Sequence, residues 1–203
     1  MLTSLRQAWA RRRLRNPEYD FLFDPPPPDE AVCFDCETTG LDRRADSIVQ
    51  IAAVRIKGRR VLTSQRLNLM VRPPAGMTAG VIKVHHLRQQ DVADGLEPME
   101  AMDRFLRFVG SRPLVGYYLE FDVAMVNRLI RPWLGIGLPQ QQIEVSSLYY
   151  DYRVAGRDAV YTGNIDLRLS VIMDDLGLPR LKAHDAFNDA VMTAMAYVKL
   201  KAG

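Results

Sequence analysis

Beyond residue 29 the sequence alternates between β-rich and helical runs, and this alternation restricts the possible folds more than any other feature. Residues 47–56 and 60–71 are rich in β-forming side chains and flank a turn at Lys57-Gly58, which predicts a hairpin. Shorter strands are expected at 31–35, 113–116 and 142–146. A hairpin followed by alternating helices and strands predicts an α/β fold, with a mixed sheet covered by helices.

Apolar residues at helical spacing predict the helices of this fold. They are expected at 78–87, 99–109, 121–130, 167–176 and 186–200. Asp166 and Asp185 directly precede the last two, and aspartate is a preferred N-cap residue. We therefore expect both of these aspartates to cap the helix that follows.

The first 28 residues differ in character from the rest. Residues 1–16 predict an arginine-rich helix with an apolar stripe, and four prolines at 25–28 form a stiff spacer. The helix could dock on its own domain or on a protein partner, which we favour, or serve as a nucleic-acid arm or a transit peptide. We expect a tail at 1–28 and one domain at 29–203.

Composition limits the class of protein but says little about its substrate. The chain has 203 residues, 48% of them hydrophobic, and no apolar run of the roughly 18 residues that a membrane span needs. We expect a cytoplasmic protein without a membrane partner. The net charge is +3, yet five arginines lie within the first 15 residues, so the remainder is net negative. A polyanionic substrate would have to be held by metal ions and local groups.

The two cysteines, Cys33 and Cys36, have the CxxC spacing of redox and zinc motifs. On a strand their side chains would point to opposite faces, no helix begins directly after them, and no second Cys or His pair lies nearby. We expect two buried, reduced thiols.

Two acids end the first apolar run, in the stretch VCFDCETTGLD. Residues two apart on a strand share a face, so Asp35 and Glu37 should be neighbours. Burying two like charges together is costly, since each disfavours the ionisation of the other. We therefore expect a positive group beside them.

Three further polar residues stand where they could join this pair. Asp122 begins a helix directly after the strand that ends in VGYY, and His184 and Asp189 lie in the stretch AHDAFNDA. A separation of five residues does not place two side chains on one helical face. His184 is therefore expected in the loop before the last helix.

The order of these motifs resembles that of the DnaQ-like 3′–5′ exonucleases of the DEDDh type. FDCETTGL and HDAFNDA are close to the family form, and the likeness extends over about 31–198. It implies a ribonuclease-H-like fold, with a mixed sheet of about five strands whose second strand is antiparallel. It also implies a hydrolase that releases nucleoside 5′-monophosphates. The residues of these motifs resemble those of polymerase-proofreading relatives more than those of the oligoribonucleotide type.

On this resemblance Asp35, Glu37, Asp122 and Asp189 bind two divalent ions, and His184 is the general base. Carboxylates about 5 Å apart repel by roughly 3 kcal/mol per pair at an effective dielectric of 20, so cations are needed to keep them ionised. All-oxygen ligation favours Mg²⁺ or Mn²⁺ over zinc. The expected substrate is a single-stranded 3′ end, with DNA favoured over RNA.

The resemblance also assigns the substrate pocket. Thr38, Thr39 and Leu41 match positions that hold the terminal nucleotide, and Gly40 would permit the turn that presents them. The chain departs from the family at Tyr117 and Tyr118, where many members have a His-Asn pair. These rings could stack on a base or merely pack over the strand end.

Two other interpretations stay open. The protein could be a 3′–5′ exoribonuclease, or a catalytically weakened module that binds nucleic acid or a polymerase. We see no clamp-binding peptide and expect a stand-alone enzyme. His85 and His86 are expected to be structural or peripheral.

Overall fold

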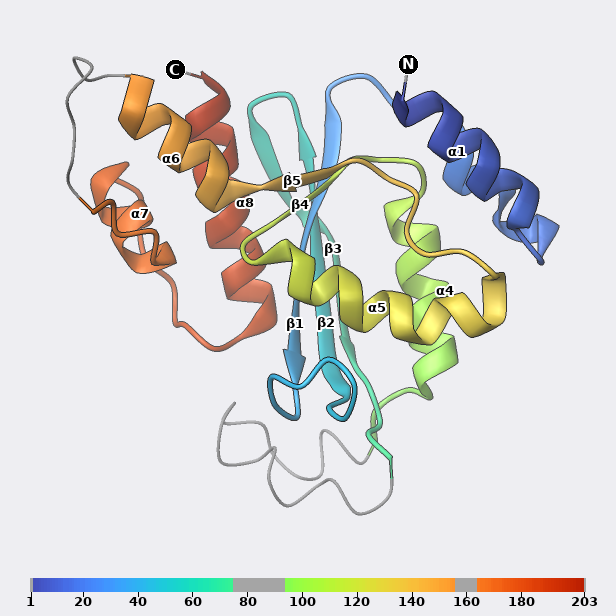
Figure 1. Ribbon diagram of the computed structural model, residues 1–203. Coiled ribbons are helices and arrows are strands. Elements are labelled where there is room, and N and C mark those ends of the chain that lie inside the picture. Colours follow the sequence, from blue (N-terminus) through green and yellow to red (C-terminus); the bar gives the residue numbers. More distant parts are fainter. Residues whose placement is uncertain (1, 75–93, 156–163, 203) are drawn as a thin grey trace.

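The computed structural model describes residues 2–74, 94–155 and 164–202. Its centre is a five-stranded sheet in the order β3-β2-β1-β4-β5 (Figure 1). The strands are β1 (Glu30–Thr38), β2 (Ile48–Lys57), β3 (Arg60–Met70), β4 (Leu114–Gly116) and β5 (Gln142–Glu144). The helix expected at 78–87, with His85 and His86, lies outside the described residues.

The sheet is mixed, as the sequence predicted. β2 runs antiparallel to both β1 and β3, whereas β4 is parallel to β1 and to β5. β1 pairs with β2 along its whole length but with β4 only at Val32 and Cys33. Beyond Cys33, therefore, the edge of β1 on the β4 side is free to receive another group.

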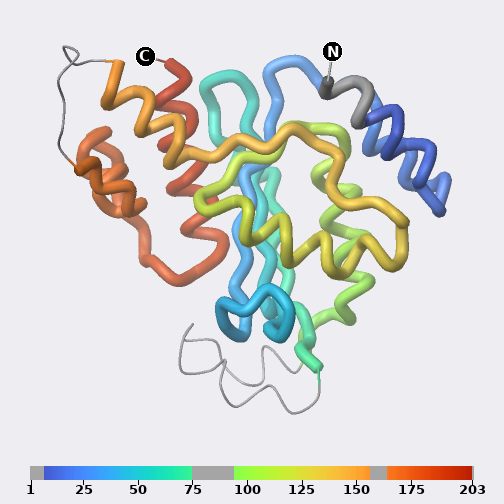
Figure 2. The backbone as a smooth tube through the Cα atoms, viewed as in Figure 1, coloured from blue at the N-terminus to red at the C-terminus, as the bar shows by residue number. Residues whose placement is uncertain are grey.

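Helices cover both faces of the sheet (Figure 2). One face carries α4 (Pro98–Val109) and α5 (Leu119–Leu134), and the other carries α6 (Val145–Ala155), α7 (Leu169–Asp175) and α8 (Ala186–Ala202). β1 alternates between these layers, because Val32 and Phe34 pack on the first side and Ala31 and Cys33 on the second. Among the described residues, no helix is both long and apolar enough to cross a membrane.

The N-terminal segment packs against the α4 and α5 layer. It contains α1 (Leu2–Arg13) and a 3₁₀ helix, η1 (Pro17–Phe23), whose Tyr19 and Leu22 are buried in the core. The Tyr19 hydroxyl donates to Asp103 of α4 at 2.5 Å, and its ring meets that of Trp133 edge-on at 4.8 Å. The segment thus docks on its own domain, while the division at residue 28 stays a prediction.

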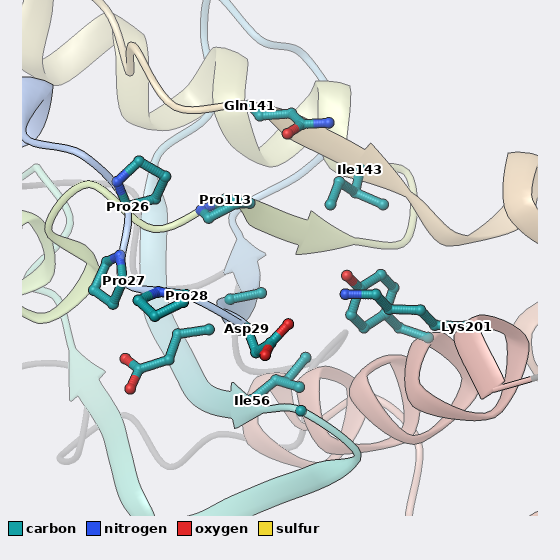
Figure 3. A pocket seen from close by; sticks show the side chains of 13 residues that line it. Pro26, Pro27, Pro28, Asp29, Ile56, Pro113, Gln141, Ile143 and Lys201 are labelled. Atoms are coloured by element: carbon teal, nitrogen blue, oxygen red, sulfur yellow. The ribbon is translucent and has the colours of Figure 1, made fainter.

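The prolines that follow lie against the end of the sheet where β1 begins. Pro26, Pro27 and Pro28 line a cavity of about 370 Å³ together with Ile56 and Lys201 (Figure 3). This cavity is at the opposite end of β1 from Asp35 and Glu37.

The structure corrects two expectations in the second half of the chain. The strand expected at 142–146 ends at Glu144, and α6, which was not expected, begins at once with Val145. α7 begins at Leu169 rather than at 167, with Arg168 as its N-cap, so Asp166 is not the cap. The Asp166 carboxylate instead accepts the Arg168 backbone N–H at 3.0 Å.

Candidate active site

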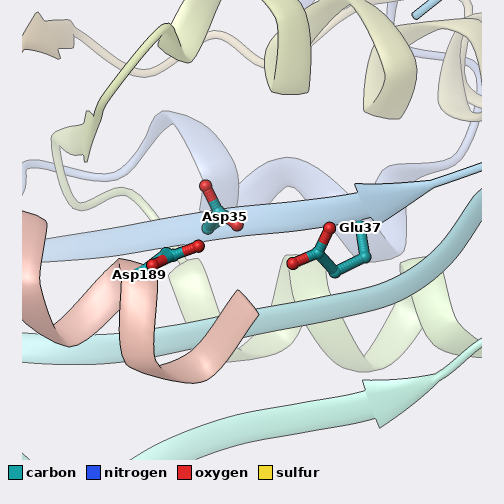
Figure 4. Close-up of side chains that lie close together, drawn as sticks. All are labelled: Asp35, Glu37 and Asp189. Carbon is teal, nitrogen blue, oxygen red and sulfur yellow. The ribbon is translucent and has the colours of Figure 1, made fainter. Parts of the chain in front are cut away.

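The acids at the end of β1 meet an acid from the last helix. Asp35 and Glu37 continue the face on which Ala31 and Cys33 contact the α8 layer, and Asp189 lies in the first turn of α8. Each of the three offers a carboxylate oxygen, and these oxygens all lie within 4.8 Å of one another. Figure 4 shows the three side chains converging from the two elements. The predicted neighbourhood of Asp35 and Glu37 is therefore present, with Asp189 beside them.

Asp122 reaches β1 from the other side of the sheet. It lies in the first turn of α5, is only 4% exposed, and accepts the Cys36 backbone N–H at 3.2 Å. That N–H lies beyond the last residue of β1 that pairs with β4, so the carboxylate satisfies the open edge of the strand. The Asp122 carboxylate is thereby fixed at Cys36, the residue between Asp35 and Glu37.

His184 lies in the loop before α8, where the spacing argument placed it. It has a left-handed backbone, with φ of 62°, and its side chain is exposed. Its backbone N–H donates to Asp189 Oδ2 at 3.2 Å, and Asp185 caps α8 by accepting the Asn188 N–H at 3.0 Å. The cap and this hydrogen bond place the imidazole beside the carboxylates, where it lines the same cleft.

Burial and mutual repulsion favour the protonated acids. The pKa of Asp35 is raised well above its usual value, first by burial and then by the charges of Asp122, Asp189 and Glu37. Burial is also the first cause of the raised pKa of Asp122, against which the Cys36 N–H acts. The pKa of Asp189 is raised to about 6 by burial and by the charge of Glu37. This set of acids is electrostatically suited to bind a cation.

The acids form the floor of a cleft of about 610 Å³. Its rim is apolar and aromatic, because Leu41 is 86% exposed, Tyr118 is 65% exposed, and Phe121 of α5 also lines it. A second depression of about 480 Å³ opens on the α7 side and shares Asp35, Tyr117, His184 and Asp189 with the first. The acidic cluster is therefore reachable from two directions.

The loop after β1 is held in shape by Asp46. The Asp46 carboxylate accepts the Thr39 hydroxyl at 2.6 Å and the Asp42 N–H at 2.8 Å. A Cβ added to Gly40 would lie 2.6 Å from an Asp46 oxygen, which explains why glycine stands there. Thr38 and Leu41 line the cleft, whereas Thr39 and Gly40 lie off it and shape the loop.

Tyr117 and Tyr118 differ in what their side chains do. The Tyr117 hydroxyl donates to the Leu167 carbonyl at 3.0 Å, and burial raises its pKa to about 12. The Tyr118 ring contacts that of Tyr117 edge-on at 4.7 Å but is otherwise exposed on the rim. Tyr117 is thus tied to the segment before α7, and Tyr118 is the ring that a ligand can meet.

Glu144 is a residue that the sequence reasoning missed. Its carboxylate accepts the N–H groups of Tyr118 and Leu119 at 3.2 and 2.9 Å, and the N–H and hydroxyl of Ser146 at 3.1 and 2.7 Å. It therefore joins the end of β5 to the first turns of both α5 and α6. The sequence did contain one signal for this role, because Glu144 stands two residues before Ser146, where a strand gives way to a helix. Tyr118 has φ of 52°, and Glu144 holds it in this left-handed conformation.

The CxxC motif forms no site. Cys33 and Cys36 are both free and buried, on opposite faces of β1, as expected. Burial raises the pKa of both thiols well above the usual value.

The comparison with protein families supplies the identification. Residues 32–197 match the family model RNase_T, described as Exonuclease. The chain belongs to this exonuclease family. The matched residues include all four acids and His184, and the resemblance noted in the motifs is confirmed.

Several relatives are named as DNA polymerase III proteins of bacteria. The chain is 23% identical to the DNA polymerase III subunit epsilon of Aquifex aeolicus, over 83% of this chain and 79% of that protein. It is 25% identical to the PolC-type DNA polymerase III of Caldanaerobacter subterraneus, over 84% of this chain but 11% of the polymerase. An epsilon-like protein of Rhodobacter capsulatus is 30% identical over 83% of this chain and 23% of its own length. The chain thus spans only a small part of some of these relatives.

Solved structures share the fold. An Escherichia coli exonuclease I complex with single-stranded DNA superposes with a TM-score of 0.70, at 17% identity over 87% of this chain and 41% of that one. Exonuclease X bound to a 5′-overhanging duplex gives a TM-score of 0.64, at 19% identity over 85% and 91%. The predicted ribonuclease-H-like exonuclease fold is therefore confirmed.

Proposed function

We propose that this exonuclease removes nucleoside 5′-monophosphates from the 3′ ends of single-stranded DNA, using two divalent ions and His184 as general base. The observation that carries the proposal is the convergence of Asp35, Glu37 and Asp189 within 4.8 Å, in a cleft that Asp122 and His184 also line. Neither a binding module nor a redox protein has a physical reason to gather these charges.

The donor set fits hard cations. All four acids offer carboxylate oxygens, the ligands that Mg²⁺ and Mn²⁺ prefer. Cys36 also lines the cleft, but burial raises the pKa of its thiol well above the usual value. Burial first, and then the charges of neighbouring acids, raise the pKa values of Asp35, Asp122 and Asp189. Bound ions would neutralise these carboxylates, hold the phosphodiester and lower the pKa of a water molecule.

The protein's own residues would position and activate the reactants. The exposed side chain of His184 lines the cleft together with Asp189 and would accept a proton from the attacking water. Leu41 and Tyr118, both exposed on the rim, would present apolar surface to the terminal base. Thr38 lines the cleft and would contact the terminal nucleotide.

DNA is proposed as the substrate because named relatives belong to DNA polymerase III and because two structural neighbours were solved with DNA. Tyr118 is a stacking platform and would tolerate any base.

The experiment uses a 5′-labelled single-stranded DNA 12-mer incubated with the full chain and Mn²⁺ or Mg²⁺. We expect a ladder that shortens from the 3′ end, mononucleotide products, and slower cleavage of the same sequence in RNA. Asp35→Asn should abolish the ladder. Asp151→Asn is the matched control, since Asp151 is exposed on α6 and away from the cleft.

Two results would overturn the proposal. One is an unshortened 12-mer with either ion, which would leave the protein as a binding module. The other is an Asp35→Asn protein as active as its parent. Faster cleavage of RNA would replace DNA by RNA as the substrate.

A further inference from the structure

A groove of about 600 Å³ runs along the outer side of α5, next to the acidic cleft. Four arginines line it: Arg43 and Arg44 from the loop after β1, and Arg128 and Arg131 from α5. The two hollows meet at Arg43, which lines both, and the first turn of α5 separates them. The groove is therefore a continuation of the cleft.

The charges of this groove are only partly compensated. Among the described residues, Glu120 is the one carboxylate that lines it, and it pairs with Arg43 at 2.6 Å. Arg128 donates to the carbonyl oxygens of Arg43 and Asp46, and its charge also acts on the Asp46 carboxylate. Within the described residues, the guanidinium groups of Arg44 and Arg131 contact no acid.

Exposed arginines elsewhere in the described part of the chain are placed differently. Arg104 and Arg107 of α4 each bind an acid four residues earlier on the same helix, at 2.6 and 2.8 Å, and such pairs leave little net charge on the surface. Arg59 and Arg60 are also exposed, but they lie at the β2–β3 turn, at the far end of the sheet from the cleft. Within that part of the chain, Arg44 and Arg131 combine the lack of an acid partner with a place in a groove that adjoins the cleft.

The distance from the acids to the far end of the groove covers several phosphates. Asp122, in the cleft, and Arg131, in the groove, are both on α5 and are separated by about 14 Å at 1.5 Å per residue. Phosphates of one strand in a duplex are about 3.4 Å apart along the axis. At that spacing, Arg131 lies roughly four phosphates away from the acids.

We propose that the nucleic-acid strand whose 3′ end enters the cleft continues over α5, and that Arg44, Arg128 and Arg131 bind its upstream phosphates. This inference rests on the proposed function and extends it, because it makes the enzyme selective for strands longer than the cleft itself. Contacts to phosphates carry no base specificity, so any sequence is held.

The test replaces Arg44 and Arg131 by alanine together and leaves Arg128, which anchors the loop, in place. The charge-matched control is Arg59→Ala with Arg60→Ala, because these exposed arginines lie at the β2–β3 turn, at the far end of the sheet. Two substrates are compared with Mn²⁺: a DNA 12-mer, and a dinucleotide whose single phosphate is the scissile one. Binding of a fluorescent 12-mer is followed separately by anisotropy without divalent ions.

For the groove double variant we expect the ratio of kcat/KM for the 12-mer to that for the dinucleotide to fall about tenfold, through KM. The slope of log affinity against log salt should fall by about 1.4, which corresponds to two single-strand phosphate contacts. The control should match the parent in both measurements.

Outcomes separate this inference from the proposed function. If the parent releases nucleotides but the groove variant keeps the parental ratio and salt slope, the groove inference is overturned and the exonuclease stands. An equal loss in the control would overturn it too, since the effect would then be one of overall charge. If nothing is hydrolysed while 12-mer binding still depends on Arg44 and Arg131, the proposed function fails and the groove assignment is supported.

Discussion

The acids at the two ends of strand β1 lie in opposite electrostatic environments. At its start, the Glu30 carboxylate binds Arg112 at 2.8 Å and Lys57 at 3.3 Å, and these cations hold its pKa below the usual value. Five and seven residues further along, Asp35 and Glu37 belong to a cluster of acids, and the pKa of Asp35 is raised. Among the described residues, no Lys or Arg forms an ion pair with Asp35.

On the proposed function, the difference separates an acid that serves folding from acids that serve catalysis. An acid with cationic partners stabilises the native state when it is ionised, whereas crowded acids destabilise it. The fold supplies cations for Glu30 and, among the described residues, none for Asp35; on the proposed function these would come from solution. Perturbed, uncompensated groups in a cleft are typical of functional sites.

The strongest way to break this comparison is to neutralise Asp35. Asp35→Asn keeps the shape of the side chain but removes its charge, so we expect activity on the 12-mer to fall at least a thousandfold, or about 4 kcal/mol in transition-state stabilisation. The metal-free protein should become more stable at pH 7.5, by about 1 kcal/mol, because one repelling charge is gone. Nucleotide release and urea unfolding measure the two effects.

Loss of activity together with loss of stability would contradict this account, since Asp35 would then resemble Glu30. Asp151→Asn, on the exposed side of α6, should change neither measurement.

Divalent ions should reverse the pH dependence of stability. The pKa of Asp189 is about 6, and those of Asp35 and Asp122 are raised too, so between pH 5 and 8 the native protein binds more protons than the unfolded chain. The metal-free protein should therefore lose stability as the pH rises through this window. Mn²⁺ at a hundred times its dissociation constant adds about 2.7 kcal/mol, and more at pH 8 than at pH 5, where protons compete.

Thermal unfolding at pH 5, 6.5 and 8, with and without Mn²⁺, gives this result directly. Asp189→Asn should flatten the pH dependence of the metal-free protein. A metal-free protein that gains stability towards pH 8 would disprove the assignment of the raised pKa values.

The sequence predicted those parts of the site whose geometry is local. Alternation along β1 placed Asp35 beside Glu37, and the spacing of five placed His184 outside the helix that carries Asp189. Fold class followed from the order of strands and helices. The convergence itself came from the family resemblance, because residues 35, 122 and 189 are distant in sequence.

The structure supplied what depends on tertiary contacts. α6 was missed because its tyrosine-rich segment has modest helix propensity, and because its first turn is capped by Glu144, a residue of the preceding strand. The core role of Tyr19 was missed since it depends on Asp103 and Trp133, more than 80 residues away. The arginine groove unites a loop and a helix that no sequence spacing connects.

Glu144 sharpens the comparison, because its carboxylate has hydrogen-bond donors as partners and yet lies next to the turn that positions Asp122. Glu144→Ala would free the N–H groups of Tyr118 and Leu119 and loosen the turn that delivers Asp122 to β1. We expect kcat to fall about tenfold, equal to about 1.4 kcal/mol, and the Mn²⁺ concentration for half-maximal activity to rise. Glu144→Gln keeps one acceptor oxygen and should recover part of both. A purely structural role would lower stability without moving the Mn²⁺ requirement.

Neutralising Glu30 should give the smallest effect and the opposite pattern. Glu30→Gln removes the partner of Arg112, whose side chain is only 17% exposed, and should cost about 1 kcal/mol of unfolding free energy at pH 7. Because the pKa of Glu30 is lowered, its contribution is present above the ordinary pKa of a glutamate and is lost as the pH falls through the native value. The parent and the variant should therefore converge in stability near pH 3, while nucleotide release at pH 7.5 stays unchanged. A tenfold loss of activity in this variant would show that the two ends of β1 are coupled, and the distinction between folding acids and catalytic acids would no longer hold along this strand.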